Sequence, residues 1–467
     1  MRGRSMSSWR DSVPELQKRL SGRAFTPESA GYDNEIAVFN TAVQHRPALV
    51  VGAADAEDVV QAVRFAARHG LHIAVLNTGH GPSLPAGDGA LMITTRRMSE
   101  IAIDTGTGTA RVEAGVRFGD LVQAAAVHGL APLAGSAPGV GVVGYTLGGG
   151  ASLTMGRKFG WAADHVSAID VVTADGQLRR VSAHSEADLF GGLLGGKSNF
   201  GVVTAMEFAL FAVTHLYAGA LFYAGEHIRG VLQEYRRFTM TAPDEISSGV
   251  TVLNLPPMPG LPSFMTGKLI VSVSLSCVGN SVVGKRLVEP LRHAAPLLMD
   301  TMADIPYNQF GQISAEPTDP APALEHFGLL RELTDDTVKA IVEVVDSAAH
   351  NGINIIHIRH LGGAFGRPPA VANAVGSRDA AFAFFALTVV PPGHRVADYR
   401  DCGAELVEAL KPWLHDHAHP GLLGPADATV ERTRRAYDPA TYRMLQIVKT
   451  MYDARNSFRF NHNVPPG

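Results

Sequence analysis

Glycines crowd the segment at residues 135–150, GSAPGVGVVGYTLGGG, which is the part of the chain best suited to hold a phosphate-bearing ligand. Gly139, Gly141 and Gly144 precede the uninterrupted run at 148–150. Glycine is used in this way where the backbone takes positive φ or where a ligand approaches the main chain closely. Backbone N–H groups freed in such a loop can surround phosphate oxygens. The segment therefore predicts a site for a large cofactor that carries a pyrophosphate.

The same glycines could instead belong to a nicotinamide dinucleotide site. The G-x-G-x-x-G spacing at residues 139–144 matches the fingerprint of that site, and Asp164 follows 20 residues later. The fingerprint requires a strand directly before the glycines and a helix that opens at them. Residues 131–135 are too short and too rich in Pro and Gly for a buried strand, and a helix would be costly to propagate through 146–150. The sequence context therefore favours a different kind of cofactor loop.

The composition is that of an ordinary globular protein. The chain has 467 residues, a hydrophobic fraction of 46%, a charged fraction of 18% and a net charge of −4, which predicts two or three domains with their own cores. Without a basic block, a nucleic-acid or membrane-surface partner is not expected, and no apolar run approaches the roughly 20 residues of a membrane span. The polar N-terminus lacks the apolar core of a secretory signal, so we expect a cytoplasmic protein. Cys277 and Cys402 lie far apart and the 19 histidines form no ligand pattern, so free thiols and no metal site are expected.

Two regions of different secondary structure are expected to position these residues. Short strands at 47–51 and 73–76 flank an amphipathic helix over 58–68, which predicts a βαβ unit. Further elements of this mixed α/β region are expected as strands at 90–93, 110–114 and 202–210, a helix over 118–128 and a hairpin over 166–181. Residues 213–410 carry longer strands, at 269–275, 353–360 and 381–389, which predict an antiparallel sheet backed by helices.

Three blocks, in their order and spacing, resemble the flavoproteins of the vanillyl-alcohol-oxidase type, and among them the berberine-bridge-enzyme-like branch. The first block is NTGHG at residues 77–81, directly after the second strand of the βαβ unit. The second is the glycine-rich segment 135–150, followed by NFGVVT at 199–204. The third is the pattern KxxYDxxNxFRxNxNxPP over 449–466. The resemblance therefore extends over nearly the whole chain.

The resemblance implies an α+β fold with a PCMH-type FAD-binding domain in two parts and a substrate domain whose antiparallel sheet is backed by helices. Residues 1–212 would form the N-terminal part of the FAD-binding domain and residues 213–414 the substrate-binding domain. Residues 415–467 would return to the FAD-binding domain as a C-terminal segment. The substrate-domain sheet would cover the isoalloxazine ring, so the active site would lie at the domain interface, where small-molecule sites often form.

The resemblance also implies FAD held by a single covalent bond, from an imidazole nitrogen of His80 to the 8α-methyl group of the flavin. A neutral imidazole is a competent nucleophile near neutral pH. Many relatives form a second bond from a cysteine at the position of Ala137, which has no nucleophile, so one bond is expected here. The residues implied in cofactor binding are Asn77, Thr78, Gly79, His80, Gly81, Ser136, Val140, Gly141, Val143, Gly144, Tyr145, Gly148, Gly149, Gly201, Val203, Asn461 and Asn463.

The implied activity is that of an FAD-dependent oxidase that takes a hydride from a C–O or C–N bond of a small organic molecule of specialised-metabolite or sugar type. O2 would reoxidise the flavin and yield peroxide. Val140 is implied at the oxygen pocket, where a small side chain accompanies fast reoxidation. A dehydrogenase with another electron acceptor, a non-redox cyclase or rearrangement catalyst, and a ligand-binding relative without catalysis are the alternatives.

His357, Arg359 and Tyr452 are the candidate catalytic residues. Strand alternation places His357 and Arg359 on one face of the strand at 353–360. The family often has a glutamate where His357 stands, and a histidine with a pKa close to operating pH can take a proton from the substrate. Arg359 could hold an anionic or carbonyl group, or pair with a carboxylate. Tyr452 is the next candidate for the base, and a purely structural role is the alternative for each of the three.

Overall fold

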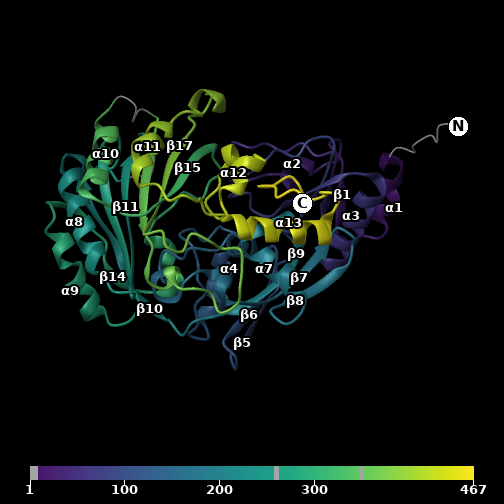
Figure 1. Cartoon of the computed structure of the whole chain (residues 1–467), viewed down its shortest axis with the longest axis horizontal. Helices are drawn as coiled ribbons and strands as arrows, with labels where there is room; N and C mark the ends of the chain where they lie inside the picture. The colour runs from purple at the N-terminus through teal and green to yellow at the C-terminus, as the bar shows by residue number, and fades with distance from the viewer. Residues whose placement is uncertain (1–8, 82, 257–261, 348–351) are drawn as a thin grey trace.

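A computed structural model describes residues 9–81, 83–256, 262–347 and 352–467. We call the part built around the strands within residues 23–209 the first body and the part built around the strands within residues 215–389 the second body. The two lie side by side along the long axis of the molecule, and the C-terminal helix α13 (Pro439–Asp453) lies on the first body (Figure 1).

The first sheet of the first body has the strand order β1-β2-β4-β3. β2 (Leu49–Gly52), β4 (Ala90–Thr94) and β3 (His72–Leu76) run parallel, and β1 (Arg23–Phe25) pairs antiparallel with β2. The predicted βαβ unit is present, with β4 lying between its two strands.

The connection between β2 and β3 is α3 (Ala56–His69), whose apolar residues recur at helical spacing and are buried. Asp55 caps its N-terminus by accepting a hydrogen bond from the Asp58 N–H at 2.9 Å. Gly70 ends the helix in the left-handed region at φ 67°, which costs glycine least. The chain then enters β3, and β3 delivers the loop that carries His80.

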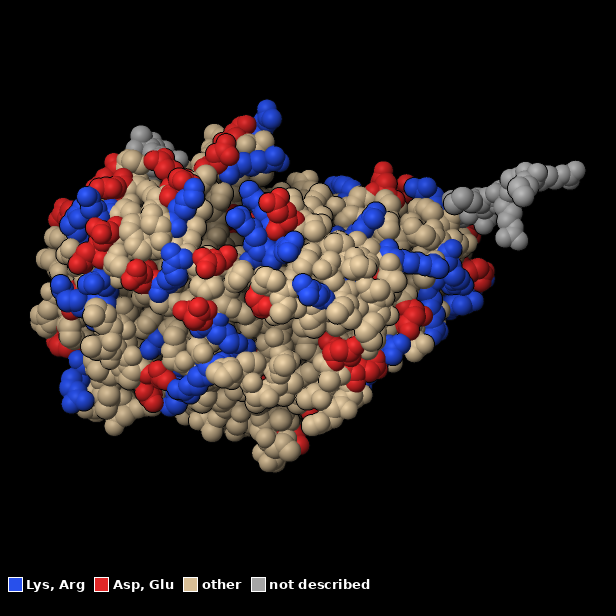
Figure 2. Space-filling model, viewed as in Figure 1, with Lys and Arg blue, Asp and Glu red and all other residues tan. Residues whose placement is uncertain are grey.

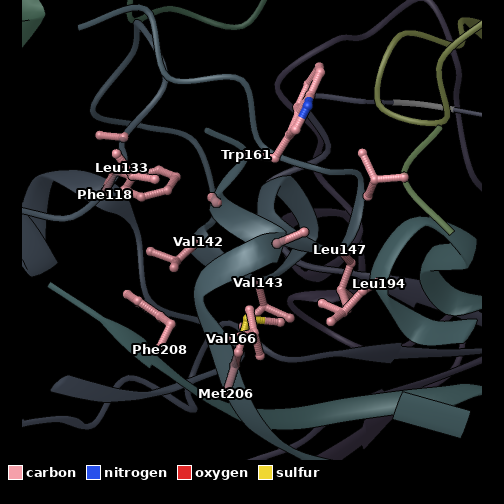
Figure 3. Close-up of a cluster of buried hydrophobic side chains, with 14 of the residues drawn as sticks. Phe118, Leu133, Val142, Val143, Leu147, Trp161, Val166, Leu194, Met206 and Phe208 are labelled. Atoms are coloured by element: carbon pink, nitrogen blue, oxygen red, sulfur yellow. The ribbon is translucent and has the colours of Figure 1, made fainter. Parts of the chain in front are cut away.

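The second sheet is antiparallel, in the order β5-β6-β9-β7-β8. Its strands are β5 (Ile101–Asp104), β6 (Thr109–Glu113), β7 (Val166–Thr173), β8 (Leu178–Ser182) and β9 (Gly201–Ala209). The helices α4 (Phe118–Ala126), α5 (Val142–Leu147) and α7 (Ala187–Gly196) are joined to this sheet by a buried apolar cluster. Figure 3 shows that cluster around α5, with Val142 and Val143 near Phe208 and Met206 of β9.

The second body is one large antiparallel sheet with helices on one face (Figure 1). Its strands are β10 (His215–Ala224), β11 (Ile246–Asn254), β12 (Leu269–Cys277), β13 (Leu297–Asp300), β14 (Ala303–Pro306), β15 (Ala323–Leu330), β16 (Ile355–His360) and β17 (Phe382–Val389). The main helices are α8 (Ile228–Thr241), α9 (Ser281–Arg292), α10 (Asp335–Asp346) and α11 (Ala404–Leu410). Even-numbered residues of β16 and β17, such as Ile356 and Phe384, belong to the apolar cluster that these helices share with the sheet. The odd-numbered residues of the two strands therefore face the first body.

The predicted α+β fold class is confirmed, and so are the hairpin that turns at Asp175 and Gly176 and the antiparallel sheet of the second body. A short helix that was not predicted, α5, begins directly after Gly141, but it ends at Leu147 and does not extend through residues 148–150. No strand precedes these glycines, however, and Asp164 is paired with Arg378 at 2.7 Å, so the nicotinamide fingerprint is not realised. In the part of the chain that the structure describes, no helix combines the length and the apolar character of a membrane span.

Candidate active site

The loop at residues 77–81 and the glycine-rich segment 135–150 lie against each other in the first body. Asn77 donates through Nδ2 to the Ala114 carbonyl oxygen at 2.9 Å. A Cβ atom on Gly141 would lie 2.6 Å from the same nitrogen, and a Cβ on Gly139 would lie 3.7 Å from Cε1 of His80. The first two sequence blocks therefore meet, and the missing side chain at residue 141 is what allows Asn77 to fit.

His80 is held in a fixed position by its neighbours. Its ring stacks on Phe39, with ring centres 3.9 Å apart and planes 9° from parallel, and its Nδ1 lies 3.0 Å from the Thr78 hydroxyl oxygen. Burial and the nearby Arg117 lower the pKa of His80 to about 4, so the imidazole is neutral at physiological pH. Gly79 takes φ 69° directly before it, and a Cβ there would collide with Val38 at 2.6 Å. The turn that presents His80 therefore needs glycine.

The run at residues 148–150 is packed from several sides. A Cβ on Gly148 would lie 3.0 Å from Cε of Lys197, one on Gly149 would lie 2.9 Å from Cε1 of His419, and one on Gly150 would lie 2.8 Å from the Tyr145 ring. Gly149 and Gly150 also take positive φ, at 107° and 74°. The Tyr145 hydroxyl is buried without a hydrogen-bond partner in the described structure, and burial raises the pKa of Tyr145.

Lys197 and His419 were missed by the sequence reasoning. Lys197 takes φ 56°, which is strained for a residue with a side chain, and burial lowers the pKa of its amine to about 8. His419 stacks on Trp161 at 4.3 Å, and its Nδ1 accepts from the Gly421 N–H at 3.1 Å. Its Nε2 is buried and unpartnered within the described residues. Their signals in the sequence were a lysine directly after two glycines and a histidine-rich stretch at 415–419.

The third sequence block is anchored to the first body. The buried Lys449 ammonium donates to the Asn199 carbonyl oxygen at 2.6 Å, to the Asp453 carboxylate at 2.7 Å and to the Phe458 carbonyl oxygen at 2.9 Å. Asn461 donates through Nδ2 to the Ser198 carbonyl oxygen at 3.2 Å. The C-terminal segment is therefore joined to residues 198–199, which are part of or adjacent to the NFGVVT block.

The other residues implied in cofactor binding have unequal surroundings. Gly81 and Gly144 face open space, since a Cβ on either would have no atom within 4 Å, and Ser136 is partly exposed. Gly201 lies in β9 against the Val172 carbonyl oxygen, where a Cβ would come within 2.5 Å. Val143 and Val203 belong to the buried apolar cluster, so only their backbone could contact a cofactor.

These residues fit FAD. The two glycine loops form a cradle that side chains would fill, which suits a pyrophosphate. Buried polar atoms without partners in the described structure are available to a heterocyclic ring with hydrogen-bonding edges. Beside the glycine run they are the Tyr145 hydroxyl and His419 Nε2, and in the C-terminal segment they are the side-chain amide oxygens of Asn461 and Asn463.

His357 faces the first body from β16. Its Nδ1 lies 2.9 Å from the Thr251 hydroxyl oxygen on β11, and its Nε2 is buried and without a partner among the described residues. Burial and Arg359 lower the pKa of His357 to about 3. The pKa of His357 therefore lies well below that of a free histidine, on which its expected role as a base rests, because the ring is desolvated and lies beside a cation.

Arg359, on the same face of β16, reaches the glycine-rich segment. Its Nη1 donates to the Ala151 carbonyl oxygen at 3.1 Å, and its Nε is buried without a partner in the described structure. Burial lowers the pKa of the Arg359 guanidinium, and the nearby Tyr145 and Glu316 act in the opposite direction. Arg359 therefore joins the sheet of the second body to the cofactor cradle.

Tyr452 lies elsewhere. Its hydroxyl is 3.4 Å from the Asp188 carboxylate, and the Arg179 guanidinium carbon is 5.6 Å from its ring centre. It lines a surface cavity of about 770 Å³ together with residues of α3 such as Arg64. All these neighbours belong to the first body, so the structure does not bring Tyr452 to His357 and Arg359, and a catalytic role for Tyr452 is not supported.

Two family models match the chain. The model of an FAD binding domain matches residues 47–182, and the model described as berberine and berberine like matches residues 416–465. These ranges contain the first sequence block, the glycine-rich segment and most of the third block.

The chain is also similar over nearly its whole length to flavin-dependent oxidases. An (R)-6-hydroxynicotine oxidase from Paenarthrobacter nicotinovorans is 28% identical over 459 residues, which cover 96% of this chain and 97% of that protein. The crystal structure of 6-hydroxy-D-nicotine oxidase from Arthrobacter nicotinovorans superposes with a TM-score of 0.85 at 27% identity, over 96% of this chain and 98% of the other. A xylooligosaccharide oxidase from Myceliophthora thermophila gives a TM-score of 0.84 at 20% identity, over 98% and 99% of the two chains, which shows a shared fold alone.

Proposed function

Since the chain belongs to the berberine-bridge-enzyme-like branch of the FAD-linked oxidoreductases of the PCMH superfamily, we propose that it is an oxidase of a small organic substrate with O2 as the electron acceptor. The observation that carries the proposal is the meeting of two surfaces: a glycine cradle beside a neutral histidine, and a sheet face with unpartnered polar atoms. FAD, when bound, would accept two electrons from a C–N or C–O bond of the substrate and return them to the acceptor.

We propose that His80 holds FAD through a single covalent bond. Its neutral imidazole has the lone pair that bond formation needs, and Phe39 and Thr78 fix the orientation of the ring. Ala137, in the position where many relatives have a cysteine, has no nucleophile for a second bond.

A C–N bond is the favoured site of oxidation. The relative that matches along 96% of the chain is a hydroxynicotine oxidase, whereas the oligosaccharide oxidase supports the fold alone. A C–O bond of a sugar-type substrate is the second candidate, because the sheet face beside His357 also presents Thr251 and the buried hydroxyls of Ser272 and Ser274.

Within this site, we propose that His357 binds the substrate through Nε2. Thr251 occupies the other ring nitrogen, so Nε2 is the atom left to face a ligand. Arg359 would place a carbonyl, hydroxyl or anionic group of the substrate near the Tyr145 hydroxyl. That His357 also accepts the substrate proton stays a prediction, and its low pKa makes it a weak base.

The test is an anaerobic screen of amines, alcohols and sugars, read by bleaching of the visible flavin absorbance, followed by air and peroxide measurement. The proposal expects one class to bleach the flavin and one peroxide to form per substrate oxidised. Bleaching with slow reoxidation and no peroxide would instead support a dehydrogenase. Turnover without bleaching would support a non-redox catalyst, and purified protein without flavin would support a ligand-binding relative.

A further inference from the structure

The sheet face that covers the cofactor cradle carries one more ionisable group, Glu325 on β15. In the register of the sheet, Glu325 lies opposite Leu387 of β17, and Leu387 lies opposite Ile355 of β16, two residues before His357. Leu329, which shares the face of Glu325, belongs to the apolar cluster of the first body, whereas Leu330 belongs to the cluster under the helices. Glu325 therefore points to the same side of the sheet as His357.

The Glu325 carboxylate differs from other inward-facing carboxylates of the protein. Glu35 is paired with Arg97 at 2.6 Å, Asp164 with Arg378 at 2.7 Å and Asp453 with Lys449 at 2.7 Å. Glu325 is only partly exposed, yet no ion pair or side-chain hydrogen bond reaches it within the described residues. Burial, together with the nearby Glu316, raises the pKa of Glu325 to about 7. A partly buried carboxylate beside a second acid is best stabilised by a cation.

Aromatic rings surround the same part of the sheet. Phe327, two residues along β15, lies 6.1 Å from Phe385 between ring centres, and Phe385 lies 5.1 Å from the ring of His357. Aromatic faces attract a positively charged nitrogen, most strongly where water is displaced. A carboxylate beside a row of rings is therefore suited to an organic ammonium group.

We propose that Glu325 is the subsite that binds a positively charged nitrogen of the substrate, so that the enzyme selects cationic amines over uncharged molecules of the same shape. This proposal rests on the proposed function, since it assigns the substrate class of that site.

Other charges near Glu325 set its pH dependence. Glu316 precedes it in the chain, and the loop at Gly424 that contacts the Glu325 backbone carries Asp427, which Arg432 approaches at 3.7 Å. From β16, His357 is neutral and Arg359 is charged but engaged with Ala151. Glu325 gains its negative charge as pH rises through about 7, so binding of a permanent cation should strengthen over that interval.

The experiment compares two probes that cannot be distinguished by shape: phenyltrimethylammonium, which has a permanent charge, and uncharged tert-butylbenzene. Each is titrated into the holoenzyme, and binding is read from the perturbation of the flavin absorbance. At pH 8 the cation should bind at least about tenfold more tightly, which corresponds to about 1.4 kcal/mol. The preference should shrink towards none at pH 5.5.

Glu325→Gln should reduce the preference at pH 8 to the level of the wild-type protein at pH 5.5, since only the aromatic rings then attract the cation, and should leave tert-butylbenzene binding unchanged. Glu405→Gln removes an exposed charge at the start of α11 and should leave the preference intact, which controls for net charge. A cation preference at pH 8 that is undiminished in Glu325→Gln, or the absence of a preference in the wild-type protein, would overturn the proposal.

The probes are not oxidised, so this result is separate from turnover. If the cation binds through Glu325 but no amine bleaches the flavin, the amine-oxidase proposal fails and the subsite stands. If amines bleach the flavin equally well in Glu325→Gln, with unchanged KM, the subsite fails and the proposed function stands.

Discussion

His357 lies over Gly249 of β11, where a side chain would collide with its ring: a Cβ there would be 2.6 Å from Cε1. The same packing removes water from the imidazole and lowers its pKa. A residue whose type alone predicts titration near neutral pH is therefore neutral in this protein. The type of a side chain could be interpreted from the sequence, but its charge depends on neighbours that the sequence pattern does not identify.

His357→Ala should slow anaerobic flavin reduction by about 100-fold, at the lower end of what general-base or positioning groups contribute, because the substrate loses its contact with Nε2. FAD should remain attached. We expect the rate of reduction to change near pH 7 in both the wild type and this variant, because Glu325 rather than His357 titrates in that interval. Stopped-flow absorbance measures both. Thr251→Val, which removes only the Nδ1 partner, should have a smaller effect. A wild-type rate of reduction in His357→Ala would contradict the role.

Val140 offers a test of the electron acceptor. It is partly buried in the cradle, where its carbonyl accepts the Phe118 N–H at 3.0 Å. Because a larger side chain would obstruct oxygen, Val140→Leu should slow reoxidation on the order of tenfold, about 1.4 kcal/mol in barrier height. Flavin reduction by substrate should be unchanged. Mixing the reduced enzyme with aerated buffer measures the first rate, and equal reoxidation in the variant and the wild type would count against an oxygen path at Val140.

At the scale of elements, strand and helix positions could be predicted because alternation and helical spacing are local properties. The pairing of the strands could not be predicted, because β4 lies between β2 and β3 through contacts between residues that are distant in sequence. The helix α5 was missed because the glycines around it indicated a loop, while the buried Val142 and Val143 stabilise it through packing (Figure 3). Glu325 was missed for a similar reason, because only the register of β15 with β17 and β16 places it on the face of His357.

The close approach of the two cofactor loops can be tested with a pair of glycines. Gly141→Ala would place a Cβ 2.6 Å from the Asn77 amide, which should displace the loop at a cost of about 1–3 kcal/mol and lower the fraction of protein that retains flavin. Gly230→Ala on α8, an exposed glycine outside the cradle whose Cβ would lie 4.0 Å from the Ala294 carbonyl oxygen, is the matched control and should retain the wild-type amount. The ratio of flavin absorbance to protein absorbance reports both. Equal retention in the two variants would contradict the contact.

Over the whole molecule, arginines hold the two bodies against each other. Arg157, which is 4% exposed, follows the glycine-rich segment and donates through Nε to the Ile246 carbonyl oxygen at 2.8 Å and through Nη2 to the Ala242 carbonyl oxygen at 3.0 Å. Arg359 connects the bodies in the other direction, because it lies on β16 of the second body and donates to the Ala151 carbonyl oxygen of the first. Figure 2 shows both signs of charge interspersed over the visible face of the molecule. The fixed arrangement of the bodies is what allows residues far apart in sequence to form one site.

A buried cation, Lys449, helps to anchor the C-terminal segment to the first body. Lys449→Met would leave the Asp453 carboxylate without its cation and the Asn199 carbonyl oxygen without its donor, and both side chains of the ion pair are fully buried. The free energy of unfolding should fall by about 3–5 kcal/mol, as for other broken buried pairs. Urea denaturation measures this loss. Lys411→Met, which removes an exposed ion pair with Glu408, should change stability by less than about 1 kcal/mol. Similar losses in the two variants would contradict the anchoring role.

We propose that FAD lies between the two bodies of this protein, attached once and through His80. Acid precipitation followed by digestion and mass spectrometry tests this attachment. The pellet should stay yellow, and one peptide, the one containing His80, should carry the mass of a single FAD. His80→Ala should lose this adduct and hold flavin less tightly. A colourless pellet with the flavin left in solution, or an FAD adduct on any other residue, would contradict the attachment at His80.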